Sequence, residues 1–519
     1  MFRLVTFMLN AFVLRYISRE LLGVVNVRLT LLYSTTLFLT REAFRRACLS
    51  KTSDRRWQQV MNLLWCIIPI GVACTGAFGY LWAYALDQPG TVSHYQGAVW
   101  CYALSVFIEL LAEPLWVVSQ LFLFVRLKVL IEGTALTVRC VLTVLLVLLF
   151  PHWGVMTFAL AQVIFTSVYT IMYYAYFIYI IQTGQVPEDF PFKTFRELLP
   201  RSIPGKPAIS WGLASLVWSF LKQSLLKQLL TEGEKYVMTI FDVVSLADQG
   251  IYDVISNLGS LAARFIFLPI EDSSYFFFSQ TLTRGVTSRE QTKSAVELAT
   301  QVLEAVLKVV IIIGVTFLVF GYAYSFLLLD LYGGSILSSG SGPALLRSYC
   351  VFVLLLAVNG ITECFAFATM SKQEVDRYNL KMVVFSVLFL ASSWYLTGAV
   401  GSIGFVLANC LNMLARIAHS LYHIHTYYKN SGLHPLRGML LKLPVIVTFA
   451  AAFVITTLSE KYFCCSHGWT YKCLHIGIGG ACLLVVMATV LLTEHQLVSF
   501  IMEQYRKRHK TDEKDTKTD

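Results

Sequence analysis

Arginine, lysine and glutamate residues recur inside long apolar stretches of this sequence, where a charged group is costly. At the centre of a membrane-spanning helix each costs about 2.5 to 3.5 kcal/mol unless it faces a polar cavity or a partner. We therefore expect a hydrophilic chamber lined by the first, second, seventh and eighth spans. The candidate substrate-binding residues are Arg15, Arg28, Arg41, Glu42, Arg45, Glu232, Glu234, Arg264, Glu271 and Arg416, with Glu109, Glu113, Lys128 and Glu363 as secondary candidates.

The arginines of this set indicate an anionic ligand. A guanidinium group is a planar fork that binds two phosphate oxygens at once. The candidates to receive a diphosphate are therefore Arg15, Arg28, Arg41, Arg264 and Arg416. The acidic residues would pair with these arginines in the empty site or accept hydrogen bonds from sugar hydroxyls. In a plainer interpretation, favoured for Arg45, Arg46 and Arg126 at the cytoplasmic boundary, each charge is ion-paired or extends to the interface near a helix end.

Glu109 and Glu113 form the closest pair of acidic candidates. They are four residues apart and so share one helix face, and Pro114 is expected to kink that helix. Together with Glu363 they could build a Na⁺ or H⁺ site, although nothing in the spacing requires one. The sequence has no H-E-x-x-H and no paired C-x-x-C motif, so we expect no metal and no other cofactor.

The apolar stretches that carry these residues predict an all-α membrane protein. The chain is 56% apolar and 14% charged, whereas a soluble globule is about 25% charged. Most stretches have about 20 residues, which a bilayer of roughly 30 Å requires of a helix. About fourteen spans are expected, at 1–18, 21–40, 61–86, 95–118, 123–149, 154–181, 222–244, 250–279, 297–321, 344–370, 379–397, 401–425, 442–459 and 472–493.

The first of these spans is too short to cross a bilayer. Only Leu4 to Leu14 lies between Arg3 and Arg15. No small-residue cleavage site follows, so the stretch is not a signal peptide. We interpret the chain as starting inside its first helix.

Loops rich in lysine and arginine alternate along the chain with loops that hold only Lys461 and Lys472. Such alternation follows from the positive-inside rule and places both termini in the cytoplasm. The net charge of +10 is spread over these cytoplasmic loops and the tail, so it does not indicate a nucleic-acid partner. The rich regions are 41–60, 119–128, 182–211, 280–296, 371–381, 425–442 and the tail after Glu494.

Short matches about 227 residues apart indicate an internal repeat. Ser18, Gly23 and Val27 recur as Ser245, Gly250 and Val254, each about 227 residues later. Further on, Glu113 matches Glu363 at a somewhat larger separation. Parallel repeats of this kind occur in transporters that bind substrate between their halves. The predicted organisation is an N-terminal lobe of six helices, a cytoplasmic linker, a C-terminal lobe of six helices, two appended helices and a cytoplasmic tail, at 1–181, 182–211, 212–425, 426–493 and 494–519.

Three stretches carry a resemblance to a known family. They are residues 24–39 with 41–48, residues 230–234, and Tyr332-Gly333-Gly334 with residues 338–343. The chain resembles the RFT family of endoplasmic-reticulum oligosaccharide-lipid translocation proteins over its whole length, with part of the usual first helix missing. That family belongs to the multidrug/oligosaccharidyl-lipid/polysaccharide exporter superfamily, whose two six-helix lobes agree with the repeat.

The resemblance implies a role in N-glycosylation. Such a protein would help a dolichyl-diphosphate heptasaccharide, with two N-acetylglucosamines and five mannoses, pass from the cytoplasmic to the lumenal leaflet of the endoplasmic reticulum. The expected partners are this glycolipid, the bilayer and other proteins of the pathway. Two alternatives are a non-transporting membrane scaffold and a multi-span dolichol-dependent glycosyltransferase. No phosphate-loop motif is present, and the expected lumenal loops hold few carboxylates, so we expect no enzyme.

The twelve cysteines mostly lie within expected spans, as small apolar packing residues. Cys464, Cys465 and Cys473 lie on or near an expected lumenal loop. A disulfide among them is compatible with an oxidising compartment, and the spacing does not specify the pairing.

Overall fold

The computed structural model describes residues 2–49, 56–86, 89–90, 92–184, 190–202, 207–241, 244–429, 431–465 and 468–494. Within these ranges the chain forms helices and no strands, which confirms the predicted all-α class. The predicted cytoplasmic tail, apart from Glu494, lies outside the described residues.

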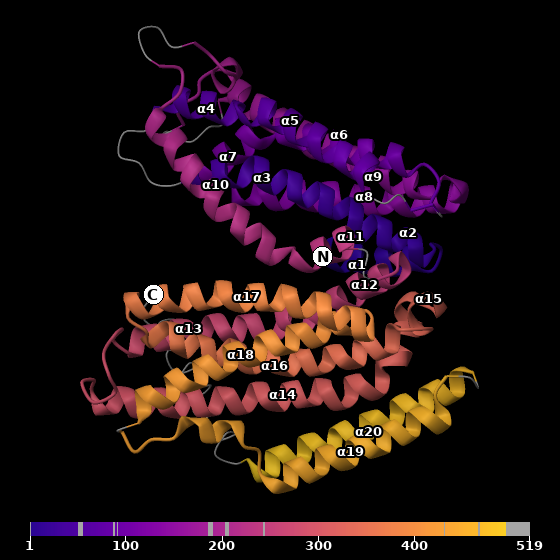
Figure 1. Cartoon of the computed structure of the whole chain (residues 1–519), viewed down its shortest axis with the longest axis vertical. Coiled ribbons are helices and arrows are strands. Elements are labelled where there is room, and N and C mark those ends of the chain that lie inside the picture. Colours follow the sequence, from indigo (N-terminus) through magenta and orange to yellow (C-terminus); the bar gives the residue numbers. More distant parts are fainter. Residues whose placement is uncertain are drawn as a thin grey trace. The chain divides into compact units, whose positions relative to one another are not determined.

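The first half of the chain folds into α-helices interrupted by two short π-helical and two 3₁₀ segments (Figure 1). Serine side chains cap the start of α2 and α12, since the hydroxyl oxygens of Ser18 and Ser245 accept from backbone N–H groups three residues later. The elements are α1 (Phe2–Leu14), α2 (Arg19–Gly23), η1 (Val24–Leu29), α3 (Thr30–Leu49), α4 (Trp57–Trp65), α5 (Ile67–Tyr80), η2 (Leu81–Ala85), α6 (Tyr95–Leu111), α7 (Glu113–Leu121), α8 (Val125–Leu149), η3 (Pro151–Trp153), α9 (Val155–Thr183), η4 (Phe195–Leu198), α10 (Trp211–Thr231), α11 (Gly233–Phe241) and α12 (Leu246–Ala262).

The second half continues without a break from α12 and contains the longest helix of the described chain, α14. The predicted span 297–321 covers only the middle of this helix, which has 41 residues. The elements are η5 (Ala263–Phe267), α13 (Leu268–Thr281), α14 (Lys293–Gly333), α15 (Ser335–Ser338), α16 (Gly342–Thr369), α17 (Lys372–Val400), α18 (Ile403–Tyr428), η6 (Pro435–Met439), α19 (Leu443–Phe463) and α20 (Trp469–Thr493).

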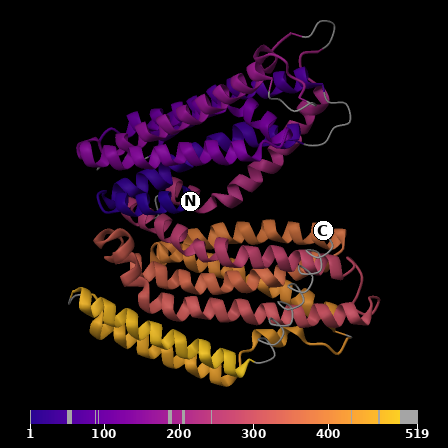
Figure 2. The ribbon, with the colours of Figure 1, turned by 180° about the vertical axis from the view of Figure 1, so that it is seen from behind.

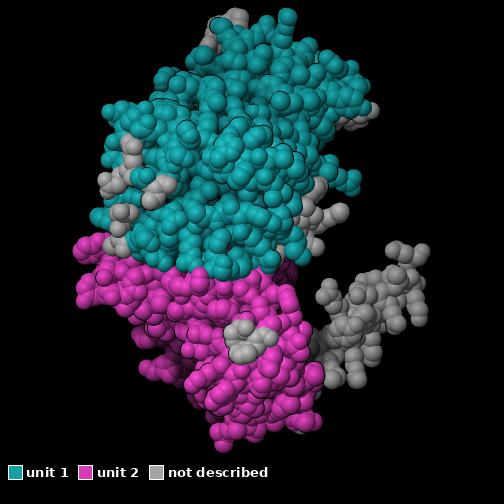
Figure 3. Space-filling view, turned by 90° about the vertical axis from the view of Figure 1, so that its right-hand side faces the viewer, with its two compact units in different colours: residues 1–253, 332–336 teal, residues 254–331, 337–519 magenta. Residues whose placement is uncertain are grey.

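The chain divides into two compact units, shown in two colours in Figure 3. Unit 1 comprises residues 1–253 and 332–336, and unit 2 comprises residues 254–331 and 337–519. The division falls inside α12, so α10 and α11 belong to unit 1. The repeat instead predicts a second lobe that begins at residue 212, and that boundary stays a prediction.

Ten described helical segments are long and apolar enough to cross a membrane, and the pair α6 and α7, bent by 41°, makes an eleventh. The three remaining predicted spans correspond to α1, to α10 with α11, and to α18. Helix α1 has 13 residues, α18 carries Arg416 among several polar side chains, and the predicted span 222–244 is divided at Glu232 between α10 and α11. The protein is therefore a multi-pass membrane protein, while the count of fourteen stays a prediction.

Two glycines allow α2 and α12 to approach closely within unit 1. A Cβ atom on Gly23 would lie 1.9 Å from the backbone oxygen of Leu246, and one on Gly250 would lie 2.5 Å from the backbone nitrogen of Gly23. Neither obstacle is the end of a flexible side chain. These two glycines are matched to each other by the repeat, and here they lie in contact.

The described part of the predicted linker is attached to α4. Its residues Phe190, Phe192 and Leu198 are buried in the core of unit 1. Trp65 Nε1 donates to the carbonyl oxygen of Leu198 at 2.7 Å, and Asn62 Nδ2 donates to that of Arg201 at 2.8 Å. This part of the linker is therefore packed onto unit 1 by side chains that the amphipathic α4 turns toward it.

Helices α19 and α20 form a hairpin at the C-terminal end of unit 2. They lie side by side in Figure 1 and in the reverse view of Figure 2. An apolar cluster that includes Val319 of α14, Phe449 of α19 and Val486 of α20 holds the hairpin on α14. Three ion pairs support this packing, at Lys308–Glu494 (3.0 Å), Arg347–Glu460 (2.6 Å) and Lys472–Asp330 (2.6 Å).

Candidate functional site

Unit 1 holds a buried cluster of four charged residues, Arg41, Arg45, Glu109 and Glu113, which we call the N-cluster. Arg41 Nη1 lies 2.5 Å from Glu109 Oε1 and 3.7 Å from Glu113 Oε2. Arg45 Nη2 donates to Glu113 Oε2 at 2.8 Å, and its Nε donates to Oε1 of the same carboxylate. Glu109 is 6% exposed and Glu113 is 1% exposed. The formal charges cancel, which reduces the cost of burying them.

The N-cluster forms because two rows of charged residues face each other across helices. Arg41 and Arg45 are one turn apart on α3, and Glu109 and Glu113 are one turn apart at the junction of α6 and α7. The predicted kink lies at this junction, because Pro114 at the start of α7 cannot donate a backbone hydrogen bond. The bend brings the two carboxylates toward α3.

Trp116 of α7 extends the N-cluster on one side. The guanidinium carbon of Arg45 lies 3.5 Å from the centroid of the Trp116 ring, and Lys128 Nζ lies 5.4 Å from it. A tryptophan face attracts cations through its quadrupole. Lys128, a secondary candidate, is thereby held near Arg45.

Unit 2 holds a second cluster, formed by Asn359 and Glu363 of α16, Tyr378 of α17 and Arg416 of α18, which we call the C-cluster. Arg416 Nη2 lies 2.5 Å from Glu363 Oε2, and Tyr378 Oη donates to Glu363 Oε1 at 2.5 Å. Asn359 Nδ2 donates to Glu363 Oε2 at 3.1 Å. The Glu363 carboxylate thus accepts hydrogen bonds from three side chains, of which only Arg416 carries a positive charge.

Glu271 of α13 packs against the same helix, α16. A Cβ atom on Gly360 would lie 1.9 Å from Glu271 Oε1, so only a glycine at this position leaves room for the carboxylate. Gly360 directly follows Asn359 of the C-cluster. The predicted residues Glu271, Glu363 and Arg416 are therefore gathered around α16 within unit 2.

Three acidic candidates are engaged in local contacts outside both clusters. Glu42 pairs with Arg46 on the same helix at 2.9 Å, and Glu232 pairs with Lys235 at 3.2 Å. Glu234 accepts a hydrogen bond of 2.6 Å from a tyrosine hydroxyl of α12. These paired side chains are partly exposed, and local ion pairs that remain partly solvated contribute little, about 0.2 to 1 kcal/mol.

The remaining arginine candidates lie in different settings. Arg15 is exposed and follows the end of α1. Arg28 is 2% exposed and lies in the π-helical segment η1. Arg264 lies in the π-helical segment η5, where its Nη2 donates to Asn257 O at 3.0 Å and to Ser260 Oγ at 2.6 Å. Arg41 and Arg264 are two of the arginines predicted to receive a diphosphate, and we call this pair the predicted arginine clamp. They belong to different units, and the clamp stays a prediction.

Several polar residues of these networks are absent from the sequence-based set. Tyr33 donates to Glu109 in the N-cluster, while Asn359 and Tyr378 bond to Glu363. Arg139 of α8 donates to Gln162 of α9. A tyrosine, an asparagine or a glutamine in a span gives little signal alone, but a single arginine within an apolar span could have been found.

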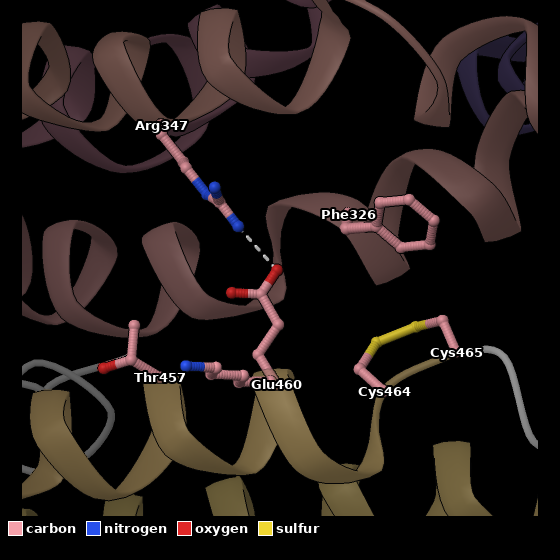
Figure 4. A pocket seen from close by; sticks show the side chains of 7 residues that line it. Phe326, Arg347, Thr457, Glu460, Cys464 and Cys465 are labelled. Carbon is pink, nitrogen blue, oxygen red and sulfur yellow. Dashed lines mark hydrogen bonds and ion pairs between the residues drawn. A yellow bond between two sulfur atoms is a disulfide. The ribbon is translucent and has the colours of Figure 1, made fainter.

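A cavity of about 490 Å³ lies between α14, α16 and the hairpin in unit 2 (Figure 4). The structure joins Cys464 to Cys465 by a disulfide at its rim and leaves Cys473 as a free, exposed thiol. None of the predicted substrate-binding residues lines this cavity. Its lining consists of Phe326, Arg347, Thr457, Glu460, Lys461, Cys464 and Cys465.

Comparison with solved structures identifies the fold. A structure described as lipid II flippase MurJ in an inward closed conformation aligns with a TM-score of 0.61 at 11% identity, over 96% of this chain and 99% of that chain. An inward-facing multidrug resistance MATE family transporter of the MOP superfamily aligns with a TM-score of 0.57 at 12% identity, over 82% of this chain and 96% of that chain. At such low identity these likenesses establish the fold alone.

Comparison with protein sequences identifies the family. The family described as Rft-1, Rft protein, matches residues 1–504. A Xenopus tropicalis protein named Man(5)GlcNAc(2)-PP-dolichol translocation protein RFT1 is 49% identical over 99% of this chain and 96% of its own length. The Mus musculus protein of the same name is 49% identical over 97% of this chain and 94% of its own length. The resemblance stated from the sequence is thus confirmed, and the chain belongs to the Rft protein family.

Proposed function

We propose that this protein moves a dolichyl-diphosphate-linked oligosaccharide, Man(5)GlcNAc(2)-PP-dolichol, from the cytoplasmic to the lumenal leaflet of the endoplasmic-reticulum membrane for N-glycosylation. The observation that carries the proposal is 49% identity, over nearly the whole chain, with relatives that are named for translocation of this glycolipid. The fold shared with transporters and the charged clusters within membrane-spanning helices support it.

The two clusters have the chemistry that such a ligand requires. In the absence of a ligand, Glu109, Glu113 and Glu363 neutralise Arg41, Arg45 and Arg416. A diphosphate can compete for these guanidinium groups because phosphate oxygens match their geometry. The released carboxylates can then accept hydrogen bonds from sugar hydroxyls, while the apolar polyprenyl chain stays in lipid.

The proposed activity needs no covalent chemistry in this chain. Within the described residues, no group of three or more histidine, cysteine, aspartate or glutamate side chains is arranged to hold a metal ion. Because relatives that are 49% identical are named for translocation, we propose that the protein is a transporter and not an enzyme. A membrane scaffold that supports a later step is the alternative that the experiment below must separate from it.

The decisive experiment uses the purified protein in vesicles that contain Man(5)GlcNAc(2)-PP-dolichol. We expect the protein to increase the rate at which glycolipid from the inner leaflet becomes accessible to a membrane-impermeant lectin. Arg41→Glu should abolish this increase, because the substituted carboxylate repels a diphosphate by several kcal/mol on a Coulomb estimate. Lys293→Gln, which changes an exposed lysine far from either cluster in the sequence, is the control.

The contrary results are also informative. If wild-type protein gives no increase but restores N-glycosylation in cells that lack the native protein, the scaffold alternative replaces the transporter. Full activity of well-expressed Arg41→Glu and Arg264→Glu would exclude the predicted arginine clamp.

Membrane orientation follows from the loop charges and can be tested separately. We expect a tag after Asp519 and a tag within 185–205 to face the cytoplasm, and a tag within 335–342 to face the lumen. Protease treatment of sealed microsomes should remove the first two tags and spare the third. Protection of the C-terminal tag would show that the proposed orientation is wrong.

A further inference from the structure

Arg139 lies near the middle of α8, a helix whose segment 126–149 is apolar and long enough to cross the membrane. A charged residue at this depth is costly unless the protein supplies a polar setting. The arginines of the two clusters, Arg41, Arg45 and Arg416, each have a carboxylate within 3 Å. Arg139 therefore requires a separate explanation.

The position of Arg139 on α8 turns it away from the exposed apolar face. Leu130, Val141 and Leu148 are 55%, 43% and 48% exposed. At 3.6 residues per turn, all three lie on the side of the helix opposite Arg139. Ala135, one turn before Arg139, is fully buried. The guanidinium group is thus directed toward the protein rather than toward lipid.

The direct contacts of Arg139 are with uncharged side chains of α9. Its Nη1 donates to Gln162 Oε1 at 2.8 Å, and its guanidinium carbon lies 5.5 Å from the centroid of the Phe165 ring. Across the described ranges, Arg139 has no carboxylate within ion-pair distance. Its positive charge is therefore not cancelled by a direct ion pair.

Gln162 contributes a buried donor. This residue is 3% exposed, and its amide nitrogen Nε2 has no hydrogen-bond acceptor among the residues that the structure describes. A buried donor left unpaired costs free energy that a bound acceptor would recover. The carbonyl oxygen of the same amide accepts from Arg139, so the group that Gln162 still offers to a ligand is a donor and not an acceptor.

We propose that Arg139 and Gln162 form a further binding site in unit 1 that takes the diphosphate group of the lipid-linked substrate. The guanidinium group supplies charge and several N–H donors, and the Gln162 amide supplies one more donor. Phosphate oxygens accept from both. This inference rests on the proposed function, because it assigns a contact to the ligand of that function. It differs from the predicted clamp, since neither residue belongs to either cluster.

Binding measurements on the full chain in lipid-containing micelles test the site. The probes are a fluorescent polyprenyl diphosphate, the corresponding uncharged polyprenol and inorganic diphosphate as a competitor. We expect Arg139→Gln to weaken binding of the polyprenyl diphosphate about tenfold or more, as loss of a charged hydrogen bond does. Polyprenol binding should not change.

Gln162→Glu separates a binding role from a structural one. The new carboxylate gives Arg139 an internal ion pair, so it should preserve or raise thermal stability while it weakens binding of the diphosphate lipid about tenfold. If Arg139 only joined α8 to α9, the same change would leave binding intact. Arg347→Gln is the matched control, since it removes an arginine that is paired with Glu460 and should leave affinity unchanged.

The results separate this inference from the proposed function. Binding of polyprenyl diphosphate by Arg139→Gln and Gln162→Glu as tightly as by wild type would overturn the site and leave the proposed function in place. Wild-type protein that binds polyprenyl diphosphate no better than polyprenol would contradict the proposed function and the site together. Displacement by inorganic diphosphate at equal concentration would assign the site to the free anion and overturn its assignment to the lipid.

Discussion

The N-cluster and the C-cluster both place charged side chains inside their units, but they differ in the number of arginines and glutamates. In the N-cluster two arginines face two glutamates, and Glu113 alone contacts both Arg41 and Arg45. In the C-cluster one arginine faces Glu363, and tyrosine and asparagine side chains supply the other hydrogen bonds. In the N-cluster, two arginines balance the charge of two carboxylates. In the C-cluster, neutral tyrosine and asparagine donors stabilise the carboxylate together with one arginine.

For the proposed glycolipid substrate, we expect this difference to give the two clusters different roles, one toward the diphosphate and one toward the glycan. Besides the charge-balanced N-cluster, unit 1 holds Lys128 and Arg139, so it can offer positive charge to an anion. Unit 2 places Glu271 beside the helix that already carries Glu363, so it offers acceptors. We expect changes in unit 1 to affect diphosphate binding most and changes in unit 2 to affect glycan recognition most.

The largest effect on stability is expected for Glu113→Gln. The glutamate side chain is 1% exposed, and its loss leaves two partly buried arginines with one carboxylate. Breaking a buried ion pair by removing one partner costs about 3 to 5 kcal/mol. Thermal unfolding in detergent should show a lower midpoint and less monodisperse protein.

The companion variant Glu113→Gln with Arg45→Met should recover part of this loss, because it removes the charge that Glu113→Gln leaves unpaired. A double variant no more stable than the single one would show that Arg45 does not depend on Glu113.

A smaller loss of about 2 kcal/mol is expected for Glu363→Gln, the equivalent change in the C-cluster. The amide oxygen can still accept from Tyr378, and the Glu363 side chain is 12% exposed whereas that of Glu113 is 1% exposed, so the altered group in the C-cluster is better solvated. The same unfolding measurement checks this order. Equal losses for Glu113→Gln and Glu363→Gln would remove the distinction drawn between the two clusters.

The sequence predicted the helices better than the contacts between them. Apolar runs of span length located most of the helices, because the bilayer thickness sets their length. The four-residue spacing placed Glu109 and Glu113 on one face before any partner was known. That this face meets Arg41 and Arg45 depends on how α3 packs against α6 and α7, which no local pattern specifies.

Other features could not be read from local pattern. The π-helical segments that hold Arg28 and Arg264 depend on packing as well as on propensity, so the sequence did not indicate them. The partner of Arg139 lies 23 residues further along, on the next helix, and is an uncharged glutamine. A search for opposite charges therefore could not find it.

An effect of about 1 kcal/mol on stability is expected for Gly360→Ala in unit 2. The added methyl group would occupy the position of Glu271 Oε1, and overpacking of this kind typically costs 1 to 3 kcal/mol. The low end applies because the obstacle is the end of a side chain, which can rotate. The affinity for a glycan-bearing lipid should fall by more than this loss of stability would explain, because the Glu271 side chain must move away from α16. Unchanged affinity for a glycan-bearing lipid would show that the position of Glu271 is unimportant.

The smallest effect is expected for Lys293→Gln, at the start of α14. Lys293 Nζ lies 3.9 Å from Glu297 Oε1, and the two side chains are 92% and 49% exposed. An exposed pair of this kind contributes about 0.3 to 0.5 kcal/mol, since water solvates both charges when the pair is broken. The variant removes one charge and one ion pair, as Glu113→Gln and Glu363→Gln do, but it leaves no charge buried. Unfolding of this variant alongside Glu113→Gln and Glu363→Gln therefore tests whether burial sets the energetic order. If Lys293→Gln lowered the midpoint as much as Glu363→Gln, then loss of an ion pair as such, rather than loss of a buried partner, would explain all three results.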